Sequence, residues 1–186
     1  MDLPADVASI FAKQEFYSMG KYACVAVAAE KIKKLPIQLN EKATIHLVGK
    51  ENQVEAFMQI TKEVYDIASD SLAAMARLYR AYKTSDKYKL YLAEVDKKPV
   101  AVLASFHDEN THTLGLYNSG TLEAYRKQGL LTALAIHAVK NAPTINNVVA
   151  FLMAAQNARG VADKLGFKEY AHFISLCYGY DNAISA

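Results

Sequence analysis

The chain has 186 residues, of which 52% are apolar and 22% charged, so it can bury a globular core and is not a disordered chain. A formal net charge of only +2 gives no reason to expect a nucleic-acid partner. The two cysteines lack metal-ligand spacing, and no apolar stretch has the length of a membrane span, so we expect a cytoplasmic protein with no bound metal and no membrane association.

The beginning of the chain predicts a helix, a strand and a linker. Apolar residues at helical spacing favour a helix over residues 5–14, and the apolar run at residues 21–30 is typical of a strand. The best linker candidate is residues 35–42, which contain proline, asparagine and charges. We therefore expect two parts, an N-terminal helix-strand extension over residues 1–41 and a main domain over residues 42–186.

The main domain alternates between the apolar periods of helices and strands. In chain order the expected elements are a strand (43–49), two helices (51–68 and 69–83), three strands (87–95, 99–107 and 111–121), a helix (127–140), a strand (146–155), a helix (157–166) and a strand (171–179). Hairpin-connected strands followed by helical crossovers predict a mixed α/β sheet.

A candidate anion site lies between the third of those strands and the next helix. Arg126, Lys127, Gln128 and Gly129 come directly before an apolar helical run. The first N–H groups of a helix have no partner within it, and a phosphate fits that position well. Gly129 would let a ligand approach the backbone closely. A solvated helix start explains the same residues equally well, and neither a Walker loop nor a GxGxxG fingerprint is present.

Two stretches resemble motifs of the GCN5-related N-acetyltransferase (GNAT) superfamily. YRKQGLLTALAIHAV, with Arg126 and Gly129, resembles motif A, and LMAAQNARGVADKLGFKEY, with KLGF at residues 164–167, resembles motif B. The resemblance covers most of the chain after the linker. It implies an α/β fold of the α+β mixed-sheet kind, the GNAT-like acyl-CoA N-acyltransferase fold: a central, mostly antiparallel sheet with a splayed parallel pair, flanked by helices.

The resemblance also implies a co-substrate, acetyl-CoA, lying in a V-shaped opening between two parallel strands. Its pantetheine would pair with the strand before motif A, and its pyrophosphate would sit on the following loop and helix start. The implied activity is acetyl-CoA dependent N-acetyltransfer to a small-molecule or peptide amine, and a homodimer is left open. The implied cofactor-binding residues are Ser119, Thr121, Arg126, Gln128, Gly129, Leu130, Leu131 and Thr132.

Two positions depart from the family pattern. Leu131 stands where a glycine or alanine is usual, and its side chain either crowds the pyrophosphate or points into the sheet. Ala162 stands where many members carry a tyrosine that protonates the departing thiolate. The expectation is therefore an N-acetyltransferase without the usual general-acid tyrosine, and the alternative is a non-catalytic GNAT-fold protein that binds CoA or a partner.

Acyl transfer needs a deprotonated amine, a polarised carbonyl and a stabilised thiolate. Candidate acids or bases are His107, Tyr117 and Tyr178, although a loop position explains the histidine and packing explains the tyrosines. The tyrosine-rich stretch at residues 77–82 is a candidate lining for an acceptor pocket, with a core role as the alternative. No catalytic residue is assigned from the sequence.

The start of the chain is similar to its end. In AKQEFYSMGKYACVAVAAEK and DKLGFKEYAHFISLCYGYDN, a helix end meets Phe16 or Phe167, and an aromatic-led strand begins near Tyr22 or Phe173. The extension at residues 1–41 therefore looks like the tail of a second, mostly missing acetyltransferase-like unit, with chance similarity as the alternative. If so, its strand packs along the main sheet.

Overall fold

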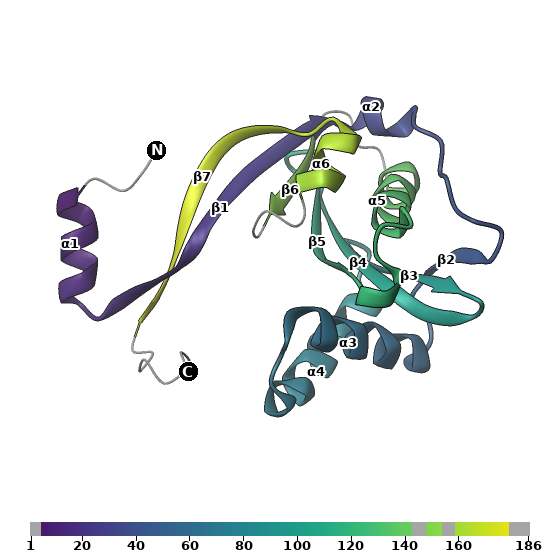
Figure 1. The fold of residues 1–186 in the computed structure, drawn as a ribbon, viewed down its shortest axis with the longest axis horizontal. Helices are drawn as coiled ribbons and strands as arrows, with labels where there is room; N and C mark the ends of the chain where they lie inside the picture. The colour runs from purple at the N-terminus through teal and green to yellow at the C-terminus, as the bar shows by residue number, and fades with distance from the viewer. Residues whose placement is uncertain (1–4, 143–147, 154–158, 179–186) are drawn as a thin grey trace.

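A seven-stranded sheet with the order β2-β3-β4-β5-β6-β1-β7 forms the centre of the protein. The computed structural model describes residues 5–142, 148–153 and 159–178 (Figure 1). The strands are β1 (Phe16–Ala28), β2 (Ala43–Leu47), β3 (Tyr88–Val95), β4 (Lys98–Asp108), β5 (Thr113–Thr121), β6 (Val148–Met153) and β7 (Lys168–Tyr178). The helices are α1 (Ala5–Lys13), α2 (Ala29–Lys33), α3 (Glu51–Tyr65), α4 (Leu72–Lys83), α5 (Leu130–Asn141) and α6 (Arg159–Leu165), with short 3-10 turns η1 (Ser69–Ser71) and η2 (Glu123–Tyr125).

Every strand pair in the sheet is antiparallel except β5 and β6. The chain passes from β5 through α5 to β6, and such a helical crossover is what a parallel pair needs. The mixed, mostly antiparallel sheet expected from the sequence is therefore confirmed.

Helices cover both faces of the sheet, because neighbouring residues of a strand point to opposite faces. On one face α3 and α4 bury Phe57 and Tyr79 against residues of β3 and β4 such as Leu92. On the other face α5 packs on β4 and β5, with Leu134 at 0% exposure, and α2 and α6 join the same core cluster beside it. Burying one such side chain fully contributes about 1.5–3 kcal/mol.

Strand β1 lies inside the main sheet, between β6 and β7, as the sequence comparison of the two chain ends predicts. Its residues from Ala23 to Ala28 pair with β6, and those from Phe16 to Ala26 pair with β7. Tyr22 and Phe173 face each other across the β1–β7 pair, with stacked rings 5.1 Å apart between centroids. Figure 1 shows β1 and β7 running out together from the helix-covered body as a two-stranded arm, with α1 at the far end.

Two helix boundaries differ from the sequence expectation. The helix expected from residue 127 begins at Leu130, because Gly129 has a φ of 79° in the left-handed region and the residues before it cannot continue the helical path. The helix expected over residues 69–83 opens with the separate 3-10 turn η1. Gly166, at φ 77°, holds the left-handed position expected after α6.

Candidate functional site

Strands β5 and β6 separate halfway along β5. Their parallel ladder joins Thr113–Leu116 to the first residues of β6, and no β6 pairing follows it within the described residues. Within the part of the chain that the structure describes, β5 pairs only with β4 from Tyr117 to Thr121, through a bulge at which Asn118 has a φ of 44°. An unpaired strand edge offers a row of N–H and C=O groups that can pair with an extended ligand. The residues present therefore fit a pantetheine-like chain at this opening.

The N-terminus of α5 lies just after β5 and carries unsatisfied amides. The helical hydrogen-bond ladder starts with the bond from Ala133 N–H to Gly129 C=O, at 2.9 Å. The N–H groups of Leu130, Leu131 and Thr132 precede this bond, and no side chain caps them. Such amides, together with the positive end of the helix dipole, suit a phosphate.

The space beside Gly129 is open. A Cβ at this position would meet only the Gln38 carbonyl oxygen, 4.0 Å away. The left-handed φ is therefore a second reason for a glycine here, besides the close approach expected from the sequence. Arg126, Lys127 and Gln128 are exposed, and the Arg126 Nε donates to the Thr121 carbonyl at 3.2 Å, which ties the loop to the end of β5.

Leu131 leaves this opening free. Its half-buried side chain packs against the core cluster between α5 and the sheet, which favours the second of the two orientations that the sequence left open. The Ser119 carbonyl accepts a hydrogen bond from the Tyr65 hydroxyl at 2.9 Å.

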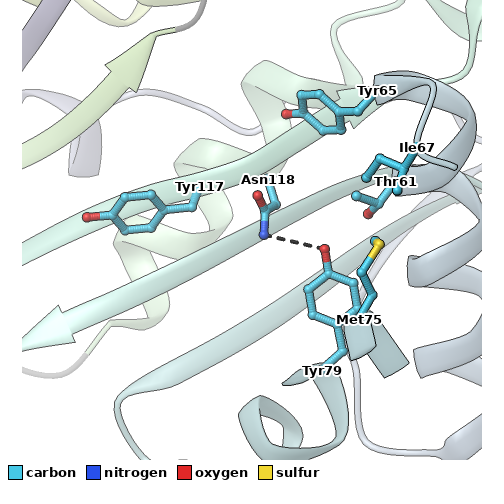
Figure 2. Close-up of a pocket in the computed structure, with 7 residues that line it drawn as sticks. All are labelled: Thr61, Tyr65, Ile67, Met75, Tyr79, Tyr117 and Asn118. Atoms are coloured by element: carbon cyan, nitrogen blue, oxygen red, sulfur yellow. Dashed lines mark hydrogen bonds between the residues drawn. The ribbon is translucent and has the colours of Figure 1, made fainter. Parts of the chain in front are cut away.

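A pocket of about 430 Å³ lies beside the β5 bulge, on the face of the sheet that α3 and α4 cover (Figure 2). Its walls come from α3 and the turn after it, from α4 and from β5. The lining residues are Thr61, Tyr65, Ile67, Met75, Tyr79, Tyr117 and Asn118.

Aromatic rings and their hydroxyls dominate this pocket. The Asn118 Nδ2 lies 3.4 Å from the Tyr79 hydroxyl oxygen, to which it donates. Burial is the main cause that raises the pKa of Tyr65, Tyr79 and Tyr117 above the ordinary value of 10.0. All three hydroxyls therefore stay protonated at neutral pH.

Tyr117 stands where the two strands part, directly after the last β5–β6 pair. Its ring lies flat over Gly115, since a Cβ on Gly115 would collide with the ring and hydroxyl of Tyr117. The sequence placed Tyr117 on this strand, but the role of Gly115 depends on a ring position that no sequence pattern reveals.

The other candidates lie away from the pocket lining. His107 was expected in an exposed loop, and that is wrong: it is 7% exposed on β4, beside Leu114 in the closed part of the sheet. Tyr178 is 65% exposed at the end of β7. Ala162 is buried in the core and supplies no hydroxyl. Of residues 77–82, Tyr79 lines the pocket, whereas the sequence had not pointed to Tyr65, Met75 or Asn118.

The described part of the chain holds no group of three or more histidine, cysteine, aspartate or glutamate side chains that could bind a metal ion. It also holds no helix with the length and apolar character of a membrane span.

Comparison with protein families gives one match. The model of the acetyltransferase (GNAT) family matches residues 54–167, a range that runs from α3 through the splayed strands to the end of α6. No protein with curated function matches the sequence.

Solved structures share the fold at low sequence identity. A functionally unknown conserved protein from Staphylococcus epidermidis ATCC 12228 gives a TM-score of 0.75 at 15% identity, over 95% of this chain and 68% of that one. A GCN5-related N-acetyltransferase from Kribbella flavida gives 0.65 at 17% identity, over 96% of this chain and 66% of that one. A predicted acetyltransferase from Clostridium acetobutylicum, solved with acetyl-CoA, gives 0.55 at 16% identity, over 69% of this chain and 91% of that one. The chain thus spans about two thirds of the first two proteins.

Proposed function

Since the family model matches more than half of its residues, the chain belongs to the GNAT acetyltransferase family, and we propose that it transfers an acetyl group from acetyl-CoA to an amine. One observation carries the proposal: a short loop joins the uncapped N-terminus of α5 to the edge of β5, which no described residue pairs after Leu116, and both border the same opening. The edge of β5 would pair with the pantetheine, and the N-terminus of α5 would bind the diphosphate. The residues proposed to bind acetyl-CoA are Ser119, Thr121, Arg126, Gln128, Gly129, Leu130, Leu131 and Thr132.

Acetyl-CoA supplies the acetyl group as a co-substrate. The amine nitrogen forms a bond to the acetyl carbonyl carbon, the carbon–sulfur bond breaks, and the proton lost by the amine balances the thiolate that leaves. Since Ala162 has no hydroxyl, we assign the protonation of the thiolate to Tyr117, which lies where β5 and β6 part. Its raised pKa keeps the hydroxyl protonated, as a proton donor must be. The proton that the amine loses then restores the Tyr117 hydroxyl, so the step balances.

The diphosphate placement is tested by two substitutions of one residue. Gly129→Asp adds a carboxylate at the helix start, and Gly129→Asn adds a side chain of the same size without the charge. Both asparagine and aspartate tolerate a left-handed backbone better than most residues do, so the pair isolates the electrostatic effect. We expect the dissociation constant for CoA, measured by calorimetry, to rise at least tenfold in the aspartate variant relative to the asparagine variant.

The native protein provides the reference for this test. At about one hundred times the dissociation constant, a ligand adds about 2.7 kcal/mol to the free energy of unfolding, which a thermal shift detects. Equal CoA affinity of the two variants would contradict the placement of the diphosphate at the N-terminus of α5. No binding to the native protein would end the proposal as a whole.

The second candidate is a GNAT-fold protein that binds CoA without catalysis. Its argument is the position of Ala162, 4% exposed in the core, where the resemblance implies a tyrosine. Thiol release from acetyl-CoA in the presence of amines separates the two candidates. Release supports the transferase, whereas binding without release over a broad amine panel supports the binder.

We also propose that residues 1–41 are the remnant of a second acetyltransferase-like unit. The β1–β7 pair supports this, because the two similar strands pair antiparallel with Tyr22 opposite Phe173. Phe16 follows α1 as Phe167 follows α6, so the order of helix, phenylalanine and strand is the same at both ends. The main domain at residues 42–186 would then complete its sheet with a strand from the remnant.

A further inference from the structure

We propose that the pocket beside the β5 bulge binds the apolar body of the acceptor, a primary amine whose body carries no second charge, such as a phenylalkylamine. This inference rests on the proposed function and gives the acceptor a chemical class. It follows from the side chains of the pocket, from their depth and from the groups at its rim.

The seven residues that line the pocket include no acidic and no basic side chain. Taking a carboxylate or an ammonium out of water without a charged partner costs several kcal/mol. An amino acid would bring a carboxylate into the pocket, and a polyamine would bring a second ammonium. The lining therefore selects against both classes and favours a neutral body.

The floor of the pocket is the apolar part. Tyr79 and Thr61 are each 2% exposed, and the Thr61 hydroxyl donates to the Phe57 carbonyl at 2.8 Å. The Tyr79 hydroxyl accepts from Asn118, so the floor presents its ring and no free charge. The Met75 thioether adds a polarisable wall, and sulfur packs favourably against aromatic rings. An aryl or alkyl body gains contact with these groups and loses no hydrogen bond.

The rim of the pocket is the polar part, and it lies on β5. Tyr117 is 42% exposed, and Asn118 is exposed beside it. Because the Asn118 Nδ2 donates to Tyr79, the Oδ1 of the same amide is left to accept from an amine N–H. An ammonium group at this rim stays in contact with water and with the Tyr117 ring, which attracts cations. The amine then lies where the strands part, and the body points towards α3 and α4.

The size of the pocket agrees with this class. A volume of about 430 Å³ lies in the lower half of the range of roughly 300–1,000 Å³ that is typical of small-molecule sites. A single aromatic ring with a short aminoalkyl chain fits such a volume. A folded protein acceptor could place no more than one side chain in it.

The test is a binding measurement that needs no chemistry. The protein is saturated with CoA, which carries no acetyl group, and phenethylamine, phenylalanine and putrescine are titrated by calorimetry. We expect phenethylamine to bind at least tenfold more tightly than the other two. Phenylalanine adds only the carboxylate to the same body, so it is the matched control ligand. Equal or reversed affinities would overturn the inference while leaving the CoA site intact.

Two substitutions on α4 sharpen the test. Met75→Lys places a cation in the pocket wall, and Leu78→Lys places one on the exposed face of the same helix, where Leu78 is 46% exposed. We expect Met75→Lys to weaken phenethylamine and to strengthen phenylalanine, whereas Leu78→Lys changes neither. Retained CoA binding shows that each variant is folded. If Met75→Lys shifts neither amine although CoA binds, the acceptor lies elsewhere. If native protein fails to bind CoA, the proposed function has failed instead.

Discussion

Single residues with unusual local chemistry set the geometry around the opening. Gly129 gives α5 its left-handed start, and Gly115 gives the Tyr117 ring its place over β5. Neither glycine contributes a functional group. Each acts by the absence of a side chain, so any larger residue changes the site through backbone strain at Gly129 or through a collision at Gly115.

His137 on α5 predicts a pH dependence of stability. Burial lowers its pKa from the ordinary value of 6.5, and its ring lies edge-on to Tyr91 at 5.7 Å between centroids. The unfolded chain then binds more protons than the folded chain between the lowered pKa and 6.5, so stability falls as the pH drops through that window. We expect His137→Gln to flatten this fall, measured by urea unfolding at a series of pH values below neutrality.

The comparison is made between the two proteins at each pH, because both contain the other histidines. His46 pairs with Glu94 at 3.3 Å, and His172 with Glu169 at 3.0 Å, and both pairs are present in native protein and variant. Their effects therefore cancel in the difference. If native protein and variant lose the same stability between pH 6.5 and the acid limit, the histidine is not the source.

Some of these residues could be found in the sequence, and others could not. Arg126 and Gly129 stand out because a helix start has a local signature of charge and glycine. Tyr65 and Asn118 come from a helix and a strand that are far apart in the chain, and only the fold brings them to one pocket. His107 was misplaced because the strand β4 continues past it to Asp108 and buries it.

At the scale of elements, the position of α3 on β5 shapes both the bulge and the pocket. The Tyr65 hydroxyl holds the Ser119 carbonyl, and Val64 packs directly on Gly120. A Cβ on Gly120 would lie 2.5 Å from the Val64 Cγ1 and 3.1 Å from its Cβ. The helix can approach the strand this closely only because residue 120 has no side chain.

Gly120→Ala is therefore expected to push α3 away from β5. The contact involves the Cβ of Val64 as well as its methyl groups, so a change of rotamer does not clear it and the helix has to move. Overpacking of this kind costs about 1–3 kcal/mol in the free energy of unfolding. Val64→Ala alone loses part of the packing, but it also makes room. When Val64→Ala is already present, we expect Gly120→Ala to lower the free energy of unfolding by at least about 0.5 kcal/mol less than it does in the native protein. The reason is that contacting residues are energetically coupled.

Urea unfolding of the four proteins measures this coupling. Gly49→Ala is a suitable control, since a Cβ at Gly49 would meet no atom within 4 Å. Additive effects of Gly120→Ala and Val64→Ala would contradict the close packing of α3 on β5.

The order and type of the elements could be predicted because each carries its own apolar period, as in α3 and in β3 to β5. Their boundaries could not be predicted equally well. The start of α5 moved by three residues because one glycine is left-handed, and η1 separated from α4 at a serine-rich turn. Boundaries depend on single φ angles, which periodicity does not report.

For the molecule as a whole, the placement of β1 decides what counts as the domain. Periodicity identifies β1 as a strand, but its partners lie at the other end of the chain, in β6 and β7. The similarity between the two chain ends was the available signal, since related strands can pair about a two-fold axis. Within the described residues β7 has β1 as its sheet neighbour, and β1 in turn covers the edge of β6.

A chain of residues 42–186 alone is therefore expected not to fold cooperatively. It would lose the buried Val25 and Val27 of β1 together with Ala29 and Ile32 of α2, the last two at 0% exposure. It would also leave β7 without its sheet neighbour, and lost backbone pairing in a sheet is costly when the groups are buried.

Removal of residues 1–13 alone takes away α1 but keeps β1, so this shorter deletion serves as the control and should retain a cooperative thermal transition. The measurement is thermal unfolding followed by near-ultraviolet circular dichroism. A sharp transition in residues 42–186 would show that β1 is dispensable for the sheet, whereas its loss in both deletions would assign the stabilising contact to α1.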